Sequence, residues 1–235
     1  MSERLVNILI TSFMKILIPC IQVTIPLTII VFAISLVLAF FLALVQVMNV
    51  RWLKNAARIY IWIFRGTPLL VQLFIIFYGL ASLGISIPAF PSAVIAFSLN
   101  LAAYNSETIR SAILSVPKGQ TEAGYMVGMN YRQIMIRIIL PQAMRMAFPN
   151  LFNSLIGLTK DTSLASSITV IELFKSAQQI AGRYFEPFAL YCEAAVIYLL
   201  LCSLLTLLQS CLEKKLIWKQ PDRKGDNRIE KGGQI

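Results

Sequence analysis

The chain has 235 residues, of which 57% are hydrophobic and only 14% are charged, and its mean hydropathy is +0.73. This apolarity excludes a soluble domain and places the chain among multi-spanning membrane proteins. The net charge of +10 does not indicate nucleic-acid binding, because the basic residues flank apolar segments instead of forming a basic face. There is no histidine, and the four cysteines lack metal-ligand spacing, which argues against a metal site or a membrane enzyme.

Uncharged stretches at 16–50, 66–106 and 194–212 can each cross about 30 Å of hydrocarbon, which takes roughly 20 helical residues. The middle stretch is too long for one crossing, and it is divided by turn formers between Gly79 and Pro91. Backbone groups in lipid must be satisfied internally, so the spans should be helices. The sequence predicts an all-α, polytopic membrane protein with about five transmembrane helices, at 20–46, 58–80, 90–114, 149–174 and 188–210.

The charges of the loops predict the topology. Arg51, Lys54 and Arg58 follow the first span and a second basic loop follows the third, whereas the loop after the second span is uncharged. Excess Lys and Arg mark the cytoplasmic side. We therefore expect a multi-pass protein of the bacterial cytoplasmic membrane with its amino terminus outside, where a short interfacial helix covers 3–15, and its carboxyl terminus inside. This divides the chain into an extracellular interfacial segment, a transmembrane domain and a disordered basic tail: 1–19, 20–215 and 216–235.

Helix-breaking residues interrupt the second predicted span. Gly66 and Pro68 lie beside Arg65, an arginine inside an otherwise apolar segment. Broken helices free backbone groups and often border substrate paths, so Arg65 and Gln72 are weaker candidates for the substrate path. An ordinary proline kink is the alternative interpretation.

The third predicted span carries polar residues of two kinds. Asn100 lies within the span and is a further weak candidate for the substrate path. Glu107 and Arg110 lie three residues apart at its inner end, a spacing typical of an ion pair on a helix surface. We assign that pair a structural role.

A polar loop separates the third and fourth spans, at 115–148. It is predicted to contain a helix at 121–129 and an amphipathic helix at 131–140, which the following proline stops. Gly128 ends the first helix at a tight turn, and Glu122 near its start complements the helix dipole. Small and apolar side chains between these residues would form a knob for a soluble partner, although an amphipathic loop packed on its own bundle is the alternative.

The fourth span places Lys160 and Asp161 near the middle of the membrane. Each charge costs roughly 2.5–3.5 kcal/mol there, so the pair should face inward, and adjacent helical residues are poorly placed to pair with each other. A zwitterionic amino acid needs one cation and one anion. We therefore expect Lys160, Asp161, Thr162 and Ser163 to line a substrate path, with Glu193 of the fifth span as a weaker candidate. The alternative is that these groups pair across helices and hold the bundle together.

The spacing of the polar loop resembles the docking loop of permease subunits in bacterial ABC importers. Its residues are Glu122, Ala123, Gly124, Gly128, Ile138, Leu140 and Pro141. The likeness to the polar-amino-acid branch of this family covers roughly Pro26 to Lys215, and the stretch 178–193 looks most like cystine-type members. The family usually has alanine where this chain has Gly124, which should loosen the helix by about 1 kcal/mol.

The resemblance implies a five-span permease that moves a polar amino acid, L-cystine or a relative, without being an enzyme itself. Its implied partners are two ATP-binding subunits on the docking loop, an extracellular solute-binding protein, and a second permease copy or a similar permease in the bilayer. ATP and Mg would be bound by the partner subunits, so no cofactor is expected in this chain, which also lacks a phosphate-binding loop motif. The alternative is an ion-coupled secondary amino-acid transporter without an ATPase.

Overall fold

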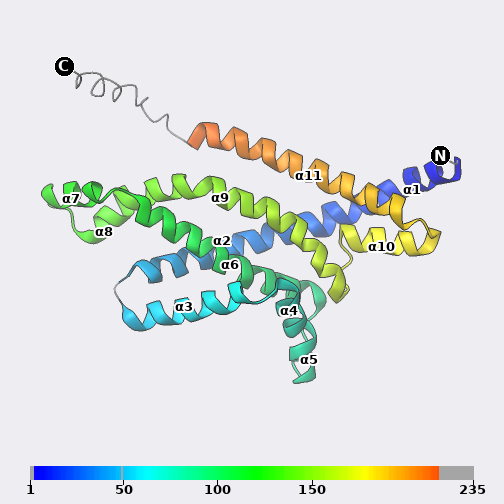
Figure 1. The fold of residues 1–235 in the computed structure, drawn as a ribbon, viewed down its shortest axis with the longest axis horizontal. Coiled ribbons are helices and arrows are strands. Elements are labelled where there is room, and N and C mark those ends of the chain that lie inside the picture. Colours follow the sequence, from blue (N-terminus) through cyan, green and yellow to red (C-terminus); the bar gives the residue numbers. More distant parts are fainter. Residues whose placement is uncertain (1–2, 49, 217–235) are drawn as a thin grey trace, which may run out of the picture.

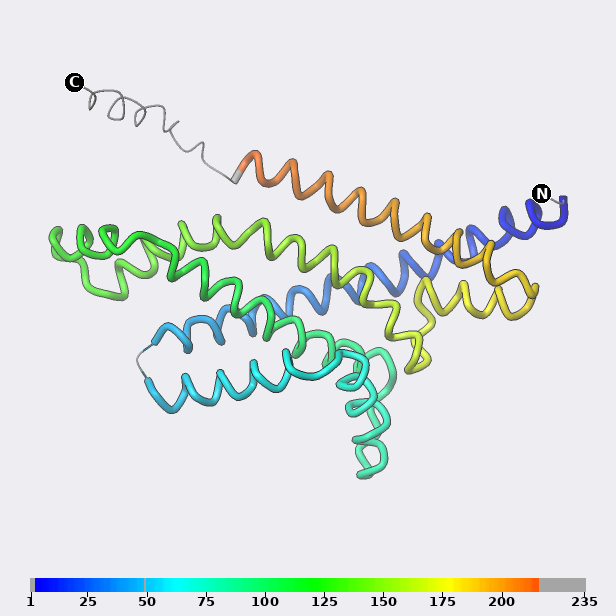
Figure 2. The backbone as a smooth tube through the Cα atoms, viewed as in Figure 1, coloured from blue at the N-terminus to red at the C-terminus, as the bar shows by residue number. Residues whose placement is uncertain are grey.

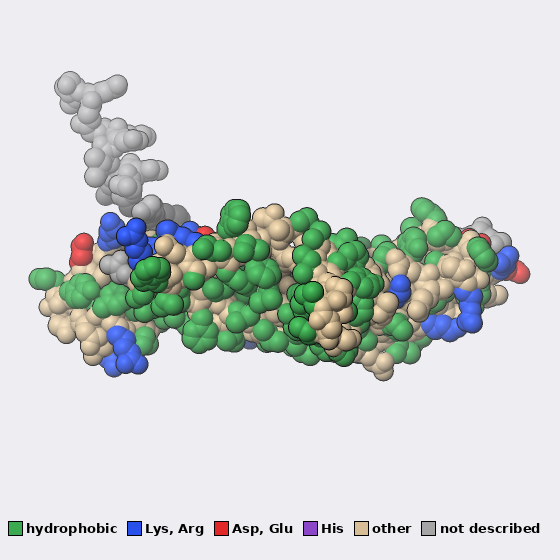
Figure 3. All heavy atoms as spheres, turned by 90° about the horizontal axis from the view of Figure 1, so that it is seen from below, with side chains coloured by type: hydrophobic (Ala, Val, Ile, Leu, Met, Phe, Trp, Pro, Cys, Tyr) green, Lys and Arg blue, Asp and Glu red, His purple; other side chains and the backbone are tan. Residues whose placement is uncertain are grey.

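The computed structural model describes residues 3–48 and 50–216, and the predicted tail beyond residue 216 lies outside that range. The described chain folds into an elongated bundle whose long helices run along one axis (Figure 1), and no strand occurs within it. Hydrophobic side chains cover the middle of the molecule, while Lys and Arg gather toward its two ends (Figure 3). The prediction of an all-α, polytopic membrane protein is confirmed.

One continuous helix of 45 residues opens the fold, from Glu3 to Val47. It consists of α1 (Glu3–Pro19), the π-helical turn η1 (Cys20–Thr24) and α2 (Ile25–Val47). The predicted boundary between a short helix at 3–15 and the first span is therefore wrong. No break occurs because the buried side of α1 packs on α10 and α11 and carries the helix onward.

The second predicted span is a sharply bent pair of helices. The two halves meet at 103° between Gly66 and Leu69, which confirms the predicted interruption but not a straight span. The second half stands away from the bundle as a separate arm (Figure 2). The elements are α3 (Arg51–Gly66), α4 (Leu69–Phe74), the π-helical turn η2 (Ile75–Gly79) and α5 (Leu80–Ser82).

Helix α6 (Ala89–Ser115) occupies the centre of the bundle and packs along α2 and α9. The contact with α2 is built from small residues: Ala39 and Ala43 on α2 and Ala93 and Ala96 on α6 are fully buried. Small side chains let helix backbones approach closely, which is a common packing device in membrane proteins. The bounds of α6 agree with the third predicted span.

A long helical run follows α7 (Lys118–Met126). It begins with α8 (Tyr131–Ile134), widens in the π-helical turn η3 (Met135–Ile139), and continues as α9 (Leu140–Asp161). The expectation that Pro141 stops this helix is wrong. Proline lacks an N–H and crowds the preceding turn, and the wider π-helical turn just before it relieves that conflict.

The fourth predicted span is not one helix over 149–174. After α9 the chain tightens into the 3₁₀ helix η4 (Thr162–Ile168) and turns at Thr169, whose φ is +69°. It then forms α10 (Leu173–Tyr184) and α11 (Pro187–Leu216). The fully buried carboxylate of Glu172 starts α10 by accepting bonds from the N–H groups of Phe174 and Lys175, at 2.8 and 2.6 Å.

Within the described ranges, two helices are long and apolar enough to cross a membrane, or three if the bent pair counts as one span. The two are Glu3–Val47 and Pro187–Lys215. The predicted number of five is not confirmed. Helices α6 and α9 are not among them because both carry polar residues on the sides that face a cavity inside the bundle.

Candidate functional site: a coupling segment and a polar cavity

The coupling segment, residues 118–140, lies at the end of the bundle where α2 finishes and α3 begins (Figure 1). Helix α7 ends in a turn at Gly128, whose φ of +78° favours glycine and whose N–H donates to the Tyr125 carbonyl at 3.0 Å. Helix α8 begins with a capping box, in which Asn130 and Gln133 exchange two bonds of 2.9 Å. The short helix and its glycine turn are present, but the helix begins three residues earlier than predicted, so Glu122 lies in its middle and not in its first turn. The capping box was missed although its Asn-x-x-Gln signature is readable.

The seven predicted coupling residues divide between an outer and an inner side. Glu122 and Ala123 are exposed on α7, and Gly128 forms the turn. Ile138 and Leu140 are half-buried against the apolar cluster around the end of α6. The segment therefore presents its carboxylate outward while its aliphatic residues hold it to the bundle. Gly124 and Pro141 complete the set, the first buried and the second exposed.

Gly124 is the point where α7 lies closest to the rest of the segment. A Cβ at this position would lie 2.7 Å from Cγ1 and 2.9 Å from Cδ1 of Ile134, and 3.5 Å from Cδ1 of Ile138. The first two distances are shorter than carbon atoms tolerate. The expectation that Gly124 merely loosens the helix is therefore incomplete, because its missing side chain is what lets α7 pack here.

The tip of the coupling segment is apolar although it projects from the polar end of the molecule. Met126 is 87% exposed and Val127 is 76% exposed, and Tyr125 beside them is also exposed. Apolar side chains in such a position mark a surface for a partner. The exposed side chains Tyr125, Met126 and Val127 belong to the set that was predicted to form a knob for a partner.

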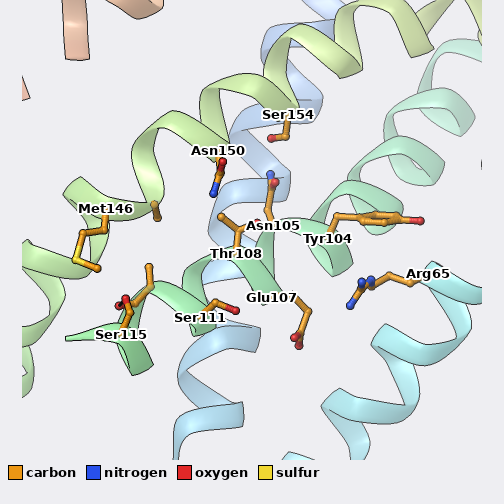
Figure 4. Close-up of a pocket in the computed structure, with 12 residues that line it drawn as sticks. Arg65, Tyr104, Asn105, Glu107, Thr108, Ser111, Ser115, Met146, Asn150 and Ser154 are labelled. Atoms are coloured by element: carbon orange, nitrogen blue, oxygen red, sulfur yellow. Dashed lines mark hydrogen bonds between the residues drawn. The ribbon is translucent and has the colours of Figure 1, made fainter. Parts of the chain in front are cut away.

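A polar cavity of about 650 Å³ lies between α3, α6 and α9. Figure 4 shows its polar side chains converging from these three helices. Of the predicted path residues, Arg65 is the one that lines it. The other lining residues were not predicted as path residues, because they lie far apart in the sequence: Tyr104, Asn105, Glu107, Thr108, Ser111, Ala112, Ser115, Met146, Ala147, Asn150 and Ser154.

The cavity offers charges of both signs. The guanidinium of Arg65 lies over the Tyr104 ring, 5.4 Å from its centroid. Glu107 supplies a carboxylate and is paired with Arg110 at 2.8 Å, which is the only ion pair between side chains in the described part of the chain and confirms the predicted pair. Asn105 is 1% exposed, and its amide nitrogen has no hydrogen-bond partner among the residues that the structure describes. An unpartnered buried donor costs about 1–3 kcal/mol, so its retention beside a cavity points to a ligand.

Gln72 and Asn100 brace the bend between α3 and α4. The Gln72 amide nitrogen donates to the Phe64 carbonyl at 2.9 Å and to the Thr67 hydroxyl at 2.7 Å. The Asn100 amide nitrogen donates to the same Phe64 carbonyl at 3.2 Å and to Gln72 Oε1 at 3.0 Å. These amides satisfy backbone groups that the broken helix frees. Neither lines the polar cavity.

The residues predicted in the fourth span lie apart from the polar cavity. Lys160 and Ser163 border a second, mostly apolar cavity of about 580 Å³ against α11. Thr162 is fully buried and donates to the Thr159 carbonyl at 2.8 Å, and Asp161 is exposed. The break after α9 thus turns these neighbours in different directions. The sequence interpretation placed all four on one straight helix.

Glu193 makes a contact between the first and the last of the described helices. Its carboxylate accepts a bond of 2.5 Å from the hydroxyl of Ser12, which ties α11 to α1. Its other oxygen is buried without a partner among the described residues. This contact favours a structural role for Glu193.

The sequence matches the family described as "Binding-protein-dependent transport system inner membrane component" over residues 35–218. The chain belongs to this family. It is therefore a membrane permease of an ABC transporter and not an ion-coupled secondary transporter, and the ATPase is a separate subunit.

Curated relatives come from several transport systems. The chain is 52% identical over 206 residues to the L-cystine transport system permease protein TcyB of Bacillus subtilis (strain 168), covering 87% of this chain and 88% of that protein. It is 45% identical to the probable amino-acid ABC transporter permease protein YckA of the same organism, over 76% of this chain and 79% of that one. The octopine transport system permease protein OccM of Rhizobium radiobacter is 40% identical, with coverage of 84% and 82%.

Solved structures support the architecture. A crystal structure of an amino acid ABC transporter with histidines contains a chain that is 32% identical, with a TM-score of 0.85 over 92% of this chain and all of that one. An inward-facing MetNI methionine ABC transporter is 19% identical with a TM-score of 0.69, over 93% of this chain and all of that one. The second likeness supports the fold alone.

Proposed function

We propose that this permease moves L-cystine, or a closely related polar amino acid, into the cell through the polar cavity. The observation that carries the proposal is the cavity itself, with Arg65, Glu107 and the unpartnered Asn105 amide around one space. A cation and an amide donor suit the carboxylate of an amino acid, and a carboxylate suits its ammonium group. The 52% identity to an L-cystine permease supports the choice of substrate.

The proposed assembly contains two permeases, which are either two copies of this chain or this chain and a similar one. Two ATP-binding subunits bind to their coupling segments. ATP and Mg bind to the ATPases, and an extracellular solute-binding protein delivers the amino acid. The coupling segment faces the cytoplasm and the amino terminus faces outward, as the loop charges indicate. Closure of the ATPases moves α7, and α9 transmits the motion because it continues the helical run from α8.

The test is uptake of labelled L-cystine by the complete transporter in liposomes, comparing wild type with Arg65→Gln. Loss of a charge-assisted bond to the substrate should reduce uptake by about tenfold or more. The control is Arg145→Gln, which removes an exposed cation of α9 that does not line the cavity and should leave uptake unchanged. Asp161→Asn should also leave uptake unchanged. Undiminished uptake by Arg65→Gln would contradict the assignment of the cavity.

The coupling role is tested separately by Glu122→Arg, a charge reversal on the exposed face of α7. We expect the ATPase subunits no longer to co-purify with the permease, while its folding is unchanged. Full retention of the ATPases would show that the docking surface lies elsewhere.

A further inference from the structure

A second polar cavity, which we call the cationic pocket, lies at the end of the bundle that carries the coupling segment. It measures about 370 Å³ and lies between the end of α2, the start of α3 and the end of α6. Lys54 and Arg58 enter it from α3, and Arg110 enters it from α6. Its remaining lining residues are Gln46, Val47, Glu107 and Leu114.

The charges of the cationic pocket are unbalanced. Three cations face one carboxylate, that of Glu107, which Arg110 already holds through Nε and Nη2. Lys54 and Arg58 have no carboxylate partner among the described residues. Grouped cations of this kind repel one another unless an anion lies between them.

The amide of Gln46 gives independent evidence for a ligand. The side chain is 7% exposed and lines the pocket. Its nitrogen makes no hydrogen bond of full geometry among the described residues, although it lies near the Glu107 carboxylate, which Arg110 already holds. A buried amide donor without an acceptor costs about 1–3 kcal/mol. An anion among Lys54, Arg58 and Arg110 would supply the acceptor.

The surroundings of the pocket indicate where the anion comes from. Trp52, on the same first turns of α3, is 87% exposed, and Leu53 beside it is also exposed. Tryptophan is enriched at membrane interfaces, and clustered Lys and Arg beside apolar segments attract anionic lipids. The geometry points to a specific site for the phosphate of an anionic phospholipid headgroup, held by Lys54, Arg58, Arg110 and the amide of Gln46.

The site also has a physical link to transport. Glu107 lines both the cationic pocket and the polar cavity between α3, α6 and α9. A phosphate beside Arg110 competes with Glu107 for the same guanidinium. Bound lipid therefore weakens the ion pair between Arg110 and Glu107, and the Glu107 carboxylate faces the proposed amino-acid path. This link rests on the proposed function, whereas the lipid site does not.

The experiment measures binding of labelled phosphatidylglycerol to the purified full-length chain in detergent, with phosphatidylcholine and inorganic phosphate as separate probes. The double variant Lys54→Gln with Arg58→Gln should weaken phosphatidylglycerol binding about 25-fold, because each surface cation contributes appreciably to anionic lipid binding. The matched control is Lys118→Gln with Arg132→Gln, which removes the same charge from exposed residues outside the pocket and should change binding less than about twofold.

A third variant distinguishes a specific lipid site from non-specific attraction by the overall positive charge. Gln46→Leu changes no charge, and it should weaken phosphatidylglycerol binding about tenfold while leaving the unfolding temperature unchanged or higher, because it removes a buried donor. Equal losses in both double variants would overturn the proposal. Saturable phosphatidylcholine binding would also overturn it, as would complete displacement of the lipid by millimolar phosphate. Because no transport is measured, failure here leaves the proposed function unaffected.

Discussion

The coupling segment and the polar cavity depart from normal burial in opposite ways. At the coupling segment, apolar Met126 and Val127 project from the polar end of the molecule. In the cavity, polar Asn105 is buried in an apolar bundle, and within the described part of the chain its amide nitrogen has no hydrogen-bond partner. Each arrangement is unfavourable for the isolated chain. Both become favourable when a partner covers the first and a ligand fills the second, so one physical criterion supports both of the proposed binding surfaces.

The largest expected effect comes from replacing an exposed apolar residue of the tip with a charged one. Met126→Asp should reduce co-purification of the ATPase subunits by about 30-fold or more, because a buried charge would replace an apolar anchor at the centre of the contact. Gln120→Asp is the matched control, since it adds the same charge at an exposed position on the same helix. Comparable losses in both variants would show that added charge, and not the apolar tip, determines docking.

A smaller effect is expected when the buried polar residue of the cavity is replaced with an apolar one. Asn105→Leu removes the unpartnered amide, so the protein should unfold at the same or a higher temperature, while uptake by the complete transporter falls about tenfold. Ser106→Ala is the control, because the Ser106 hydroxyl is satisfied by the Ala103 carbonyl at 2.8 Å and lies outside the cavity. A destabilised Asn105→Leu variant would indicate that the amide has a structural role.

The smallest expected effect concerns the packing that holds the coupling segment in place. Gly124→Ala gains about 1 kcal/mol of helix propensity but forces Ile134 to move, so the net change in unfolding free energy should stay within about 1 kcal/mol. Combining it with Ile134→Ala should cost less than the sum of the single changes, because the clash is removed. Strict additivity in this double-mutant cycle would contradict the close contact.

The sequence predicts the local structure of the coupling segment better than that of the cavity, because the information for a helix and a turn is local. Glu122, Gly128 and the following aliphatic residues lie within one short stretch, and a helix followed by a glycine turn needs only neighbouring residues. The packing of Gly124 on Ile134 could not be foreseen, because it depends on how two helices approach. The function of the whole chain followed from this stretch and from the family likeness.

The cavity could not be assembled from the sequence. Arg65, Glu107 and Asn150 come from three helices, and no spacing rule brings them together. The fourth span was misjudged because a long apolar stretch does not reveal a 3₁₀ segment or the turn at Thr169. Pro141 was misjudged because a π-helical turn can absorb a proline that would otherwise end a helix.

The first helix of the fold extends farther than a membrane is thick. Its 45 residues measure about 68 Å at 1.5 Å per residue, against roughly 40–45 Å for a bilayer with its headgroups. Its amino-terminal part packs on α10 and α11, and the hydrogen bond between Ser12 and Glu193 adds a link to α11. The end of the bundle away from the coupling segment is therefore built by α1 together with these two helices (Figure 1).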